Sequence, residues 1–579
     1  RESLLANPSL DFGRVLFVRR KGAEGLPQNW QGNDPLHGRS FDNEIAVFSM
    51  ADPEKSPETV FRPEKPVFVG DLNLHFDGEK LLFSTDGTVC EVRTDGSGFR
   101  PVIREVDSYD ACYLPDERII FASNSGYHAV PCVGGADYVG NLHIAQPDGT
   151  GIRRLCFDQD NNWNPTMLAN GRVLYTRWEY TDSAHYFSRV LMHMNPDGTN
   201  QVEFYGSNSY WPNSIFYAKP LPGSSTKFVA IVSGHHGPAR MGELVLFDAA
   251  RGRHEADGAL QKIPGHGKPV VPLILDNLVG NTWPKFLHPF PLSEKHFLVS
   301  CRPSPQDRWG IYLVDVFDNM LPLLLLPDAH AMEPIPLRPT PRPPVLPDRV
   351  RPGETEATVY ITDIYEGQGL RRVPRGTVQS LRVFQYEYSY RNTGGHYVVG
   401  YEGPWDVRRL LGTVPVFADG SAVFRIPANT PVAVQPLDAE GKAMAHMRSW
   451  FVGMPGEVVS CVGCHEKQSS VPPPIRTTAA RSAPVPIQDW HGPRRGFSFR
   501  REVQPVLDRF CVGCHDGSRQ GVPVSWTTAR RSPSRRRRAS TRSPTSRCTP
   551  SSAATGRRET TTCSRHWSST PTPANWSSF

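Results

Sequence analysis

The sequence lacks a long hydrophobic run. The longest apolar stretch of the 579 residues, Ile311 to Leu326, is interrupted by Asp315 and Asp318. A membrane-spanning helix needs about 20 predominantly apolar residues, so we expect no transmembrane segment and a soluble protein. A secretory leader is missing as well, because the chain starts at Arg1 and residues 4–12 are too short and polar to form its apolar part. We interpret this start as processed or incomplete.

The end of the chain lacks the residues that build a core. From residue 521 onward there is no Leu, Ile, Lys or Asp, and eleven Arg accompany a single acid, Glu559. Such a segment cannot bury enough apolar surface to fold. Its Arg, Ser, Thr and Pro are typical of an out-of-frame reading of a GC-rich gene, and a disordered basic tail is the alternative. A nucleic-acid arm would also be basic, but this composition favours the frameshift, and we expect no nucleic-acid partner.

One motif is present twice. The pentapeptide Cys-Val-Gly-Cys-His is the attachment signature of c-type haem, because two thiols at this spacing reach the porphyrin vinyl groups and the adjoining His ligates the iron. We predict two covalently attached haems c. The predicted attachment and iron-ligating residues are Cys461, Cys464, His465, Cys511, Cys514 and His515. A four-cysteine zinc site is the alternative, but zinc does not need a His after each second cysteine. Haem c is attached outside the cytoplasm, so we expect a periplasmic or otherwise exported protein.

The first 330 residues repeat with a period near 50. An Asp-Gly turn recurs at Asp95, Asp148 and Asp197, and short alternating stretches flank each copy. Several short strands per repeat of this length are typical of propeller blades. We predict a mainly β protein that begins with a six-bladed β-propeller over residues 1–330. The predicted blades lie near residues 13–50, 66–100, 110–155, 163–205, 210–255 and 283–325.

Proline-rich stretches suggest the remaining domain boundaries. Nine prolines between residues 327 and 352 predict a stiff linker over 331–355. Alternating stretches then predict a β-sandwich-like middle domain over 356–468, which ends in the first motif. A Pro/Ser linker, 469–492, leads to a small and truncated cytochrome c-like segment, 493–519, followed by the low-complexity tail, 520–579.

The second motif follows an expected helix. The apolar residues at helical spacing before Cys511 are Phe499, Val503, Val506, Leu507 and Phe510. Pro505 restricts the start of this helix to residues 502–504, because proline is tolerated in the first turn.

The predicted propeller, proline-rich linker, β-domain and two haem motifs together resemble the α-subunit of hydrazine synthase and the α-subunit-like proteins of planctomycete-type bacteria. The resemblance covers roughly residues 10–519. The stretches that carry it, besides the two motifs, are residues 210–217, 233–237, 242–248 and 311–319. It implies an exported multihaem protein that works with the other subunits of a complex.

The resemblance also implies where this chain differs from hydrazine synthase itself. In that enzyme the middle-domain iron is held by a Tyr four residues after the motif His, and the His binds zinc. Here the corresponding position is Ser469, and no Tyr follows Tyr401. We therefore expect His465 to be an ordinary axial ligand and do not expect hydrazine synthesis.

Two further sets of residues are candidates for ligands. Met454 and His446 lie shortly before the first motif and are candidates for its sixth ligand, with core packing as the alternative for the methionine. A zinc or substrate site could use His235, His236 and Cys301, although histidines in Gly-containing loops usually face solvent.

Three functions remain open on these residues. The leading hypothesis is a dihaem cytochrome that carries electrons between redox partner proteins, with the propeller as docking platform. The second is a haem oxidoreductase with an open first haem, acting on a small substrate such as a nitrogen compound. The third is a binding module whose propeller holds a partner or a polysaccharide.

Overall fold

The computed structural model describes residues 7–515, apart from 23–24, 34–35, 37–39, 53–54, 134, 180–187, 389, 392–406, 467–470, 472–473 and 493–497. Ser469 and the tail from residue 520 onward lie outside the described residues. Strands dominate the described part, which confirms the mainly β prediction. None of the helices in this part is both long and apolar enough to cross a membrane.

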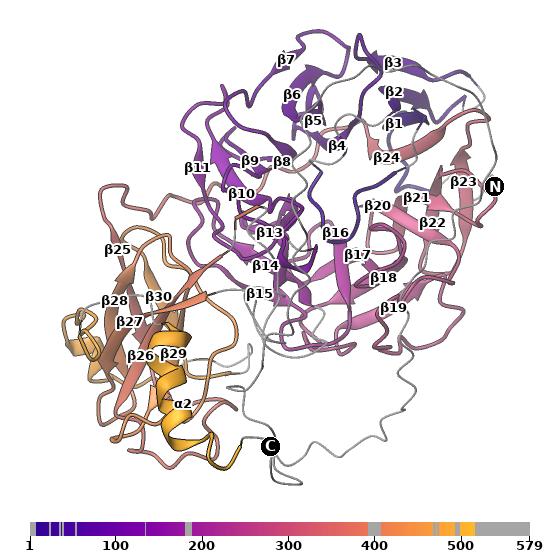
Figure 1. The fold of residues 1–579 in the computed structure, drawn as a ribbon. Helices are drawn as coiled ribbons and strands as arrows, with labels where there is room; N and C mark the ends of the chain where they lie inside the picture. Colours follow the sequence, from indigo (N-terminus) through magenta and orange to yellow (C-terminus); the bar gives the residue numbers. More distant parts are fainter. Residues whose placement is uncertain are drawn as a thin grey trace, which may run out of the picture. The chain divides into compact units, whose positions relative to one another are not determined.

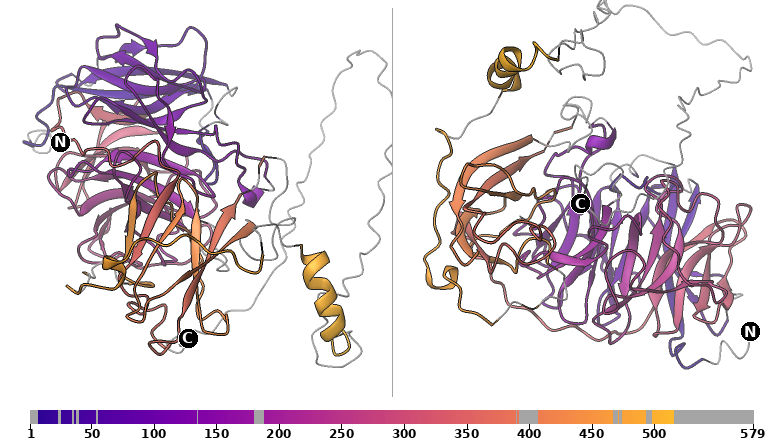
Figure 2. Two further views of the ribbon diagram at one scale, coloured as in Figure 1. Left: turned by 90° about the vertical axis from the view of Figure 1, so that its left-hand side faces the viewer. Right: turned by 90° about the horizontal axis from the view of Figure 1, so that it is seen from below.

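Six four-stranded antiparallel meanders form the propeller, and they can be followed around a ring in Figure 1 and from two further directions in Figure 2. The first blade contains β1 (Arg14–Gly22), β2 (Phe41–Ser49), β3 (Glu58–Phe61) and β24 (His330–Pro336). The second contains β4 (Val69–Leu74), β5 (Lys80–Thr85), β6 (Thr88–Arg93) and β7 (Arg100–Pro101). The third contains β8 (Tyr109–Tyr113), β9 (Ile119–Ser123), β10 (Asn141–Ala145) and β11 (Arg153–Arg154).

The other three blades follow in chain order. The fourth contains β12 (Asn162–Met167), β13 (Val173–Glu179), β14 (Ser188–Met194) and β15 (Val202–Tyr205). The fifth contains β16 (Ser214–Pro220), β17 (Lys227–Ser233), β18 (Glu243–Asp248) and β19 (Ala259–Ile263), and a single parallel pair joins it to the fourth. The sixth contains β20 (Lys285–Pro291), β21 (His296–Arg302), β22 (Gly310–Asp315) and β23 (Met320–Leu324).

The ring is closed by a strand from each end of the propeller sequence. β24 pairs with β1, with Leu16 opposite Ile335 and Val18 opposite Met332. The innermost strands also contact one another in the order β4, β8, β12, β16, β20, β24 and back to β4. The predicted six-bladed propeller is therefore confirmed.

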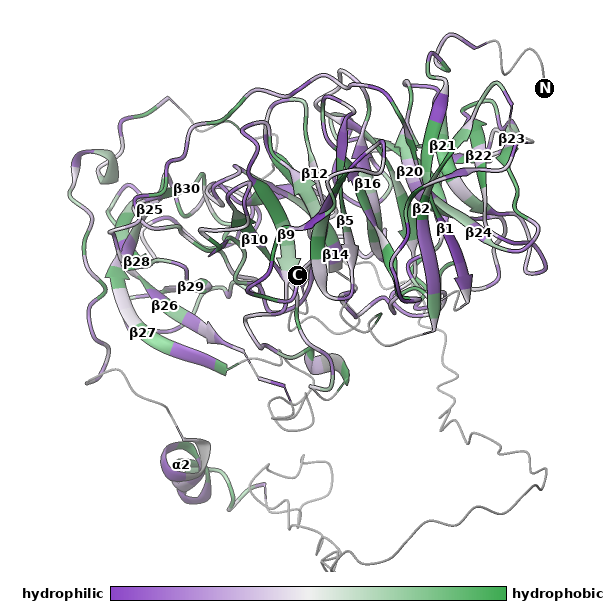
Figure 3. Cartoon of the chain, turned by 90° about the horizontal axis from the view of Figure 1, so that it is seen from above, coloured by the Kyte–Doolittle hydropathy of each residue, from purple (hydrophilic) through white to green (hydrophobic). Residues whose placement is uncertain are grey.

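The central strands of the blades, such as β5, β9 and β21, are buried on both faces, which explains their nearly continuous apolar runs. In β5, Leu81 and Phe83 pack toward the first blade, whereas Leu82 packs toward the third. Successive side chains of a strand point to opposite faces, so one strand contributes to two inter-blade cores. Figure 3 shows the resulting hydrophobic stretches along the strands of the propeller.

Every innermost strand has a β-bulge, in which two residues are left out of the ladder and the first has a positive φ. A left-handed residue repeated at such bulges is a built feature of the fold. The six left-handed residues, one per blade, are Asp71, Asp110, Asn164, Tyr217, His288 and Glu333. We call this set the bulge belt.

A β-sandwich follows the propeller. One sheet has the order β28 (Ala422–Pro427), β25 (Glu356–Ile361), β30 (Val458–Cys461). The other has the order β27 (Val407–Pro415), β26 (Ser380–Glu387), β29 (Val432–Leu437). Inward-facing residues of both sheets, such as Val359, Leu381 and Phe424, form one core. The β-sandwich-like middle domain is confirmed.

Residues 498–515 belong to a second compact unit, described here by itself. A π-helical turn, Phe499–Val503, leads into α2 (Gln504–Phe510), and Pro505 occupies the first turn of α2. A helix therefore precedes Cys511, as the apolar spacing predicts.

Two predicted linkers contain ordered structure. β24 lies where the linker 331–355 was expected to begin, so the stiff segment starts after Pro336. Pro334 and Pro336 are tolerated because β24 pairs with β1 alone, and an edge strand does not need every N–H. In the predicted linker 469–492, Val485 and Gln488 bridge to Phe424 and Thr413 of the sandwich.

Candidate functional site

The first motif lies at the end of β30. Ile361 of β25 is the parallel partner of Cys461, and the backbone of Thr362 donates to the Cys461 carbonyl at 3.0 Å. Beyond the strand, the N–H of Cys464 donates to the carbonyl of Glu366 at 2.9 Å. The loop after β25 therefore holds both cysteines through backbone hydrogen bonds.

The loop after β25 leaves no room for a side chain at Gly463, the middle residue of the motif. A Cβ on Gly463 would lie 2.4 Å from the carbonyl oxygen of Glu366 and 2.7 Å from that of Asp363. Both atoms belong to backbone, which cannot move aside as a flexible side chain can. The close approach explains why the motif has glycine here.

The first motif places two thiols and an imidazole at the edge of the sandwich core. Cys461 and Cys464 are free thiols, partly exposed, at the edge of the sandwich core. Burial raises the pKa of each thiol to about 12, so the sulfurs are neutral. The adjoining His465 is exposed and has a left-handed backbone, with φ of 56°. Two free thiols on an apolar edge and one accessible imidazole are the groups that a covalently held haem needs.

The second motif continues from α2. The N–H of Cys511 donates to Leu507 at 2.8 Å, and that of His515 donates to Cys511 at 3.0 Å. Cys511 and Cys514 are free thiols, and Cys514 is exposed. Val506 and Phe510 on the helix are 52% and 70% exposed, which leaves apolar surface available to a prosthetic group.

The two predicted sixth-ligand residues are engaged elsewhere. Met454 is fully buried in a cluster with Trp450 and Val452. Its sulfur packs against Gly198 of the fourth blade, since a Cβ built on that glycine would lie 3.4 Å from it. His446 is hydrogen-bonded to Arg408 through Nε2, and Gln435 lies 3.5 Å from Nδ1. The structure thus gives the methionine a packing role and the histidine polar partners.

Met454 belongs to a contact between sandwich and propeller that the sequence does not reveal. Trp450 Nε1 donates to Asp158 at 2.9 Å, and the guanidinium of Arg177 lies 4.5 Å from the Trp450 ring centroid. Glu457, just before β30, accepts the backbone N–H of Asn200 at 2.6 Å. These partners are some 250–290 residues apart in sequence, so no local pattern indicates them. They attach the segment that leads into Cys461 to the fourth blade.

The three residues predicted as zinc ligands do not lie together. His235 and His236 come together with Asp276, with ligand atoms within 4.8 Å, whereas Cys301 lies in the core between the fifth and sixth blades. Arg189 Nη1 donates to His235 Nδ1 at 3.0 Å. Because arginine can only donate, Nε2 of a neutral His235 carries the proton and has no lone pair for a metal. A metal bound through Nε2 would have to displace this proton, and a metal role for His235 and His236 stays a prediction.

Fold and motifs together define a class of protein: a six-bladed propeller, then a β-sandwich that ends in a Cys-x-x-Cys-His motif, then a helix that leads to a second copy. Residues 376–466 match the family described as hydrazine synthase alpha subunit middle domain. The middle domain therefore matches this family over residues 376–466, and the rest of the chain is hydrazine synthase alpha-like in fold.

Solved structures agree at the level of fold. Hydrazine synthase from Kuenenia stuttgartiensis has a TM-score of 0.67 and 16% identity, over 88% of this chain and 82% of that chain. TolB from Acinetobacter baumannii has a TM-score of 0.35 and 11% identity, over 56% of this chain and 66% of that chain. Among curated proteins no sequence matches significantly.

Proposed function

We propose that this protein is a dihaem c-type cytochrome that carries electrons, with the propeller as its docking platform. One observation carries the proposal. Each of the two motifs presents two free cysteines next to a histidine, the first at the edge of an apolar core and the second after a helix with exposed apolar residues. The hydrazine synthase alpha-like fold supports a redox role of this kind.

The residues that would hold the haems have separate tasks. Cys461 and Cys464 would form the thioethers of the first haem, and His465 would ligate its iron. The bound haem would supply a reversible one-electron couple. Met444 and Met447 pack on the same core as the two cysteines and would help to exclude water.

The compartment and the partners belong to the same proposal. Covalent haem attachment takes place outside the cytoplasm, so we place the protein in the periplasm or another exported location. Its partners would be redox proteins, including other subunits of a multihaem complex.

Haem content tests this proposal. The full chain is expressed with a haem-ligation system, and haem per chain is measured from the pyridine haemochrome spectrum. We expect two haems in the unaltered protein and one in each of the double variants Cys461→Ala/Cys464→Ala and Cys511→Ala/Cys514→Ala. The propeller variant Cys90→Ala, at a buried cysteine, is the matched control and keeps both. Absence of haem from the unaltered chain would refute the proposal.

A second function is favoured by the positions of Met454 and His446. Because both are engaged elsewhere, the first haem would lack a sixth protein ligand and could bind a small substrate, as in an oxidoreductase. Carbon monoxide separates the two functions. A shift of the reduced spectrum that is lost in the Cys461→Ala/Cys464→Ala variant indicates an open first haem, whereas an unmoved spectrum indicates an electron carrier.

A further inference from the structure

The propeller contains a cavity that belongs to neither haem motif. Its volume is about 710 Å³, which lies in the range of small-molecule sites. All six residues of the bulge belt line it, and so do residues 338–344 of the proline-rich linker. We call those linker residues the strap.

Most of the bulge belt has a structural task. The backbone N–H of one bulge donates to the side chain of the preceding one: Asp110 to Asp71 at 3.1 Å, Asn164 to Asp110 at 2.5 Å, and Tyr217 to Asn164 at 2.9 Å. Glu333 accepts the N–H of Leu72 at 2.9 Å. These bonds join neighbouring blades and explain why the positions are polar.

Three acceptor atoms of the bulge belt take no part in these hydrogen bonds between blades. Asp110 accepts the hydrogen bonds from Asn164 through Oδ2, and Glu333 accepts the one from Leu72 through Oε2. Within the described part of the chain, no hydrogen bond reaches Asp110 Oδ1 or Glu333 Oε1. This second oxygen of Glu333, Oε1, forms an ion pair with Arg20 at 3.8 Å. His288 Nδ1 is buried and likewise has no hydrogen-bond partner there. Asp110 Oδ1 and His288 Nδ1 are therefore left to a ligand, and Glu333 Oε1 can accept a hydrogen bond beside its ion pair with Arg20.

The charges around the carboxylates are unevenly distributed. Burial, together with the neighbouring Asp71, raises the pKa of Asp110 to about 7, although Arg240 and Lys219 act in the opposite direction. The negative charge of Asp71 disfavours ionisation of Asp110, and a cationic ligand would offset this repulsion. Asp110 therefore gains a counter-charge when a cationic ligand binds.

The pKa values of Glu333 and His288 are shifted as well. Burial, with Asp71 and Asp110, raises the pKa of Glu333 to about 7 against the effect of Arg20. Burial lowers the pKa of His288, and the charges of Arg20, Lys219 and Arg240 lower it further. His288 is therefore neutral and can accept a hydrogen bond, as the two carboxylates can.

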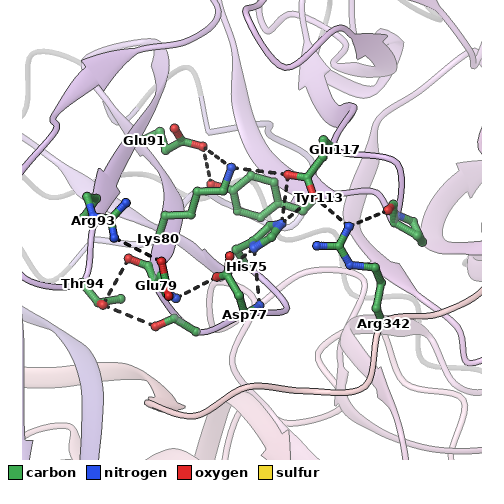
Figure 4. Close-up of polar contacts among 12 residues, drawn as sticks. His75, Asp77, Glu79, Lys80, Glu91, Arg93, Thr94, Tyr113, Glu117 and Arg342 are labelled. Atoms are coloured by element: carbon green, nitrogen blue, oxygen red, sulfur yellow. Dashed lines mark hydrogen bonds and ion pairs between the residues drawn. The ribbon is translucent and has the colours of Figure 1, made fainter.

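Much of the remaining wall is apolar. Lys219, Arg338 and Arg342 also line it, and the two arginines are paired with Asp11 and Glu117. Phe76, Met167 and Phe290 line the cavity with prolines of the strap. Arg342 of the strap donates to Glu117 at 2.8 Å, and Glu117 also contacts His75, as Figure 4 shows. A ligand with an apolar group would thus meet a preformed surface, which lowers the entropy cost of binding.

A single metal ion does not fit this arrangement. The carboxylates of Asp71, Asp110 and Glu333 do not gather within 4.8 Å of one another, as the ligands of one ion would. The acceptors are spread around a cavity large enough for an organic molecule.

We propose that the propeller cavity binds a small organic ammonium ion, whose N–H groups donate to Asp110, Glu333 and His288 and whose apolar part packs on Phe76 and Phe290. The site goes beyond the proposed electron transfer and does not depend on it. It would make the propeller a ligand-binding domain.

Calorimetric titration of the full chain with benzylamine tests the proposal, with benzyl alcohol as the neutral probe of the same shape. We expect benzylamine to bind and the alcohol to bind at least tenfold more weakly. Benzylamine affinity should rise about tenfold from pH 6 to pH 8, because binding needs a carboxylate whose pKa is near 7.

The variants Asp110→Asn and Glu333→Gln keep the carbonyl oxygen that accepts the neighbouring N–H and remove the charge. Each should weaken benzylamine binding at least tenfold at pH 8, whereas Glu58→Gln, at an exposed carboxylate on β3, should leave it unchanged. Circular dichroism confirms that each variant is folded. No benzylamine binding, equal binding of benzyl alcohol, or unchanged affinity in both folded cavity variants would overturn the proposal.

Discussion

At the scale of single residues, the bulge belt has a stability cost as well as a ligand-binding consequence. Asp110 is held in the left-handed region at φ 53°, and its pKa is raised by burial and by Asp71. An aspartate whose pKa is higher in the folded state loses stability as the pH rises from its ordinary value near 4 to about 7. The folded protein therefore carries an electrostatic penalty at pH 8 that is absent at low pH.

Asp110→Asn should accordingly stabilise the protein at high pH. Asparagine tolerates a positive φ and keeps an acceptor for the Asn164 N–H. We expect the thermal midpoint to rise by a few degrees at pH 8, and the gain to disappear as the pH falls through 7 toward 4. Asp95→Asn is the control, because hydrogen bonds from Ser97 lower the pKa of this exposed residue. A gain at pH 8 that persists unchanged at pH 4 would contradict the electrostatic cause.

A second prediction at this scale concerns Gly463 in the first motif. A Cβ there would meet two backbone oxygens at 2.4 and 2.7 Å, so Gly463→Ala should destabilise the middle domain by about 1–3 kcal/mol, as overpacking does. Gly353→Ala is the matched control, since its Cβ would meet nothing within 4 Å. Thermal unfolding followed by circular dichroism measures both, and equal midpoints for the two variants would show that the motif loop is not tightly fitted.

At the scale of elements, the segment before β30 sets the position of the first motif. It contains Trp450, which is 3% exposed and bonded to Asp158 and Arg177, and Glu457, which is bonded to Asn200. β30 begins one residue after Glu457 and ends at Cys461. The propeller therefore positions the edge of the sandwich that contains the first motif through a very short connection.

Trp450→Ala should loosen this attachment. Removing a buried tryptophan costs about 3–5 kcal/mol, and here it also leaves Asp158 without its indole donor. We expect a lower thermal midpoint and faster proteolysis between propeller and sandwich. Trp490→Ala, at a 38% exposed tryptophan, should change neither measurement. Equal proteolysis rates in the two variants would mean that Trp450 does not hold the domains together.

Elements also show what the sequence could and could not predict. The Asp-Gly turns and alternating stretches were sufficient to predict six blades. The spacing of Val503, Leu507 and Phe510 was sufficient to predict the helix before Cys511. β24 was missed because Pro334 and Pro336 suggest a linker, and only the closed ring shows that this strand needs one partner alone. The belt was missed because its six positions share a backbone conformation and no residue type.

At the scale of the whole molecule, the chain combines two kinds of site. Six blades form a closed ring around a belt of polar side chains, and the sandwich attached to the fourth blade ends in a motif whose cysteines and histidine fit a haem. The hydrazine synthase alpha-like fold unites the two parts. Redox chemistry is proposed for the motifs and ligand binding for the propeller, so the two functions can be tested separately.

The mass of the intact protein, after expression with a haem-ligation system and denaturation, tests the central claim most directly. Covalent attachment survives denaturation, so we predict a mass greater than that of the chain by two haem groups. A mass equal to that of the chain alone would contradict the account.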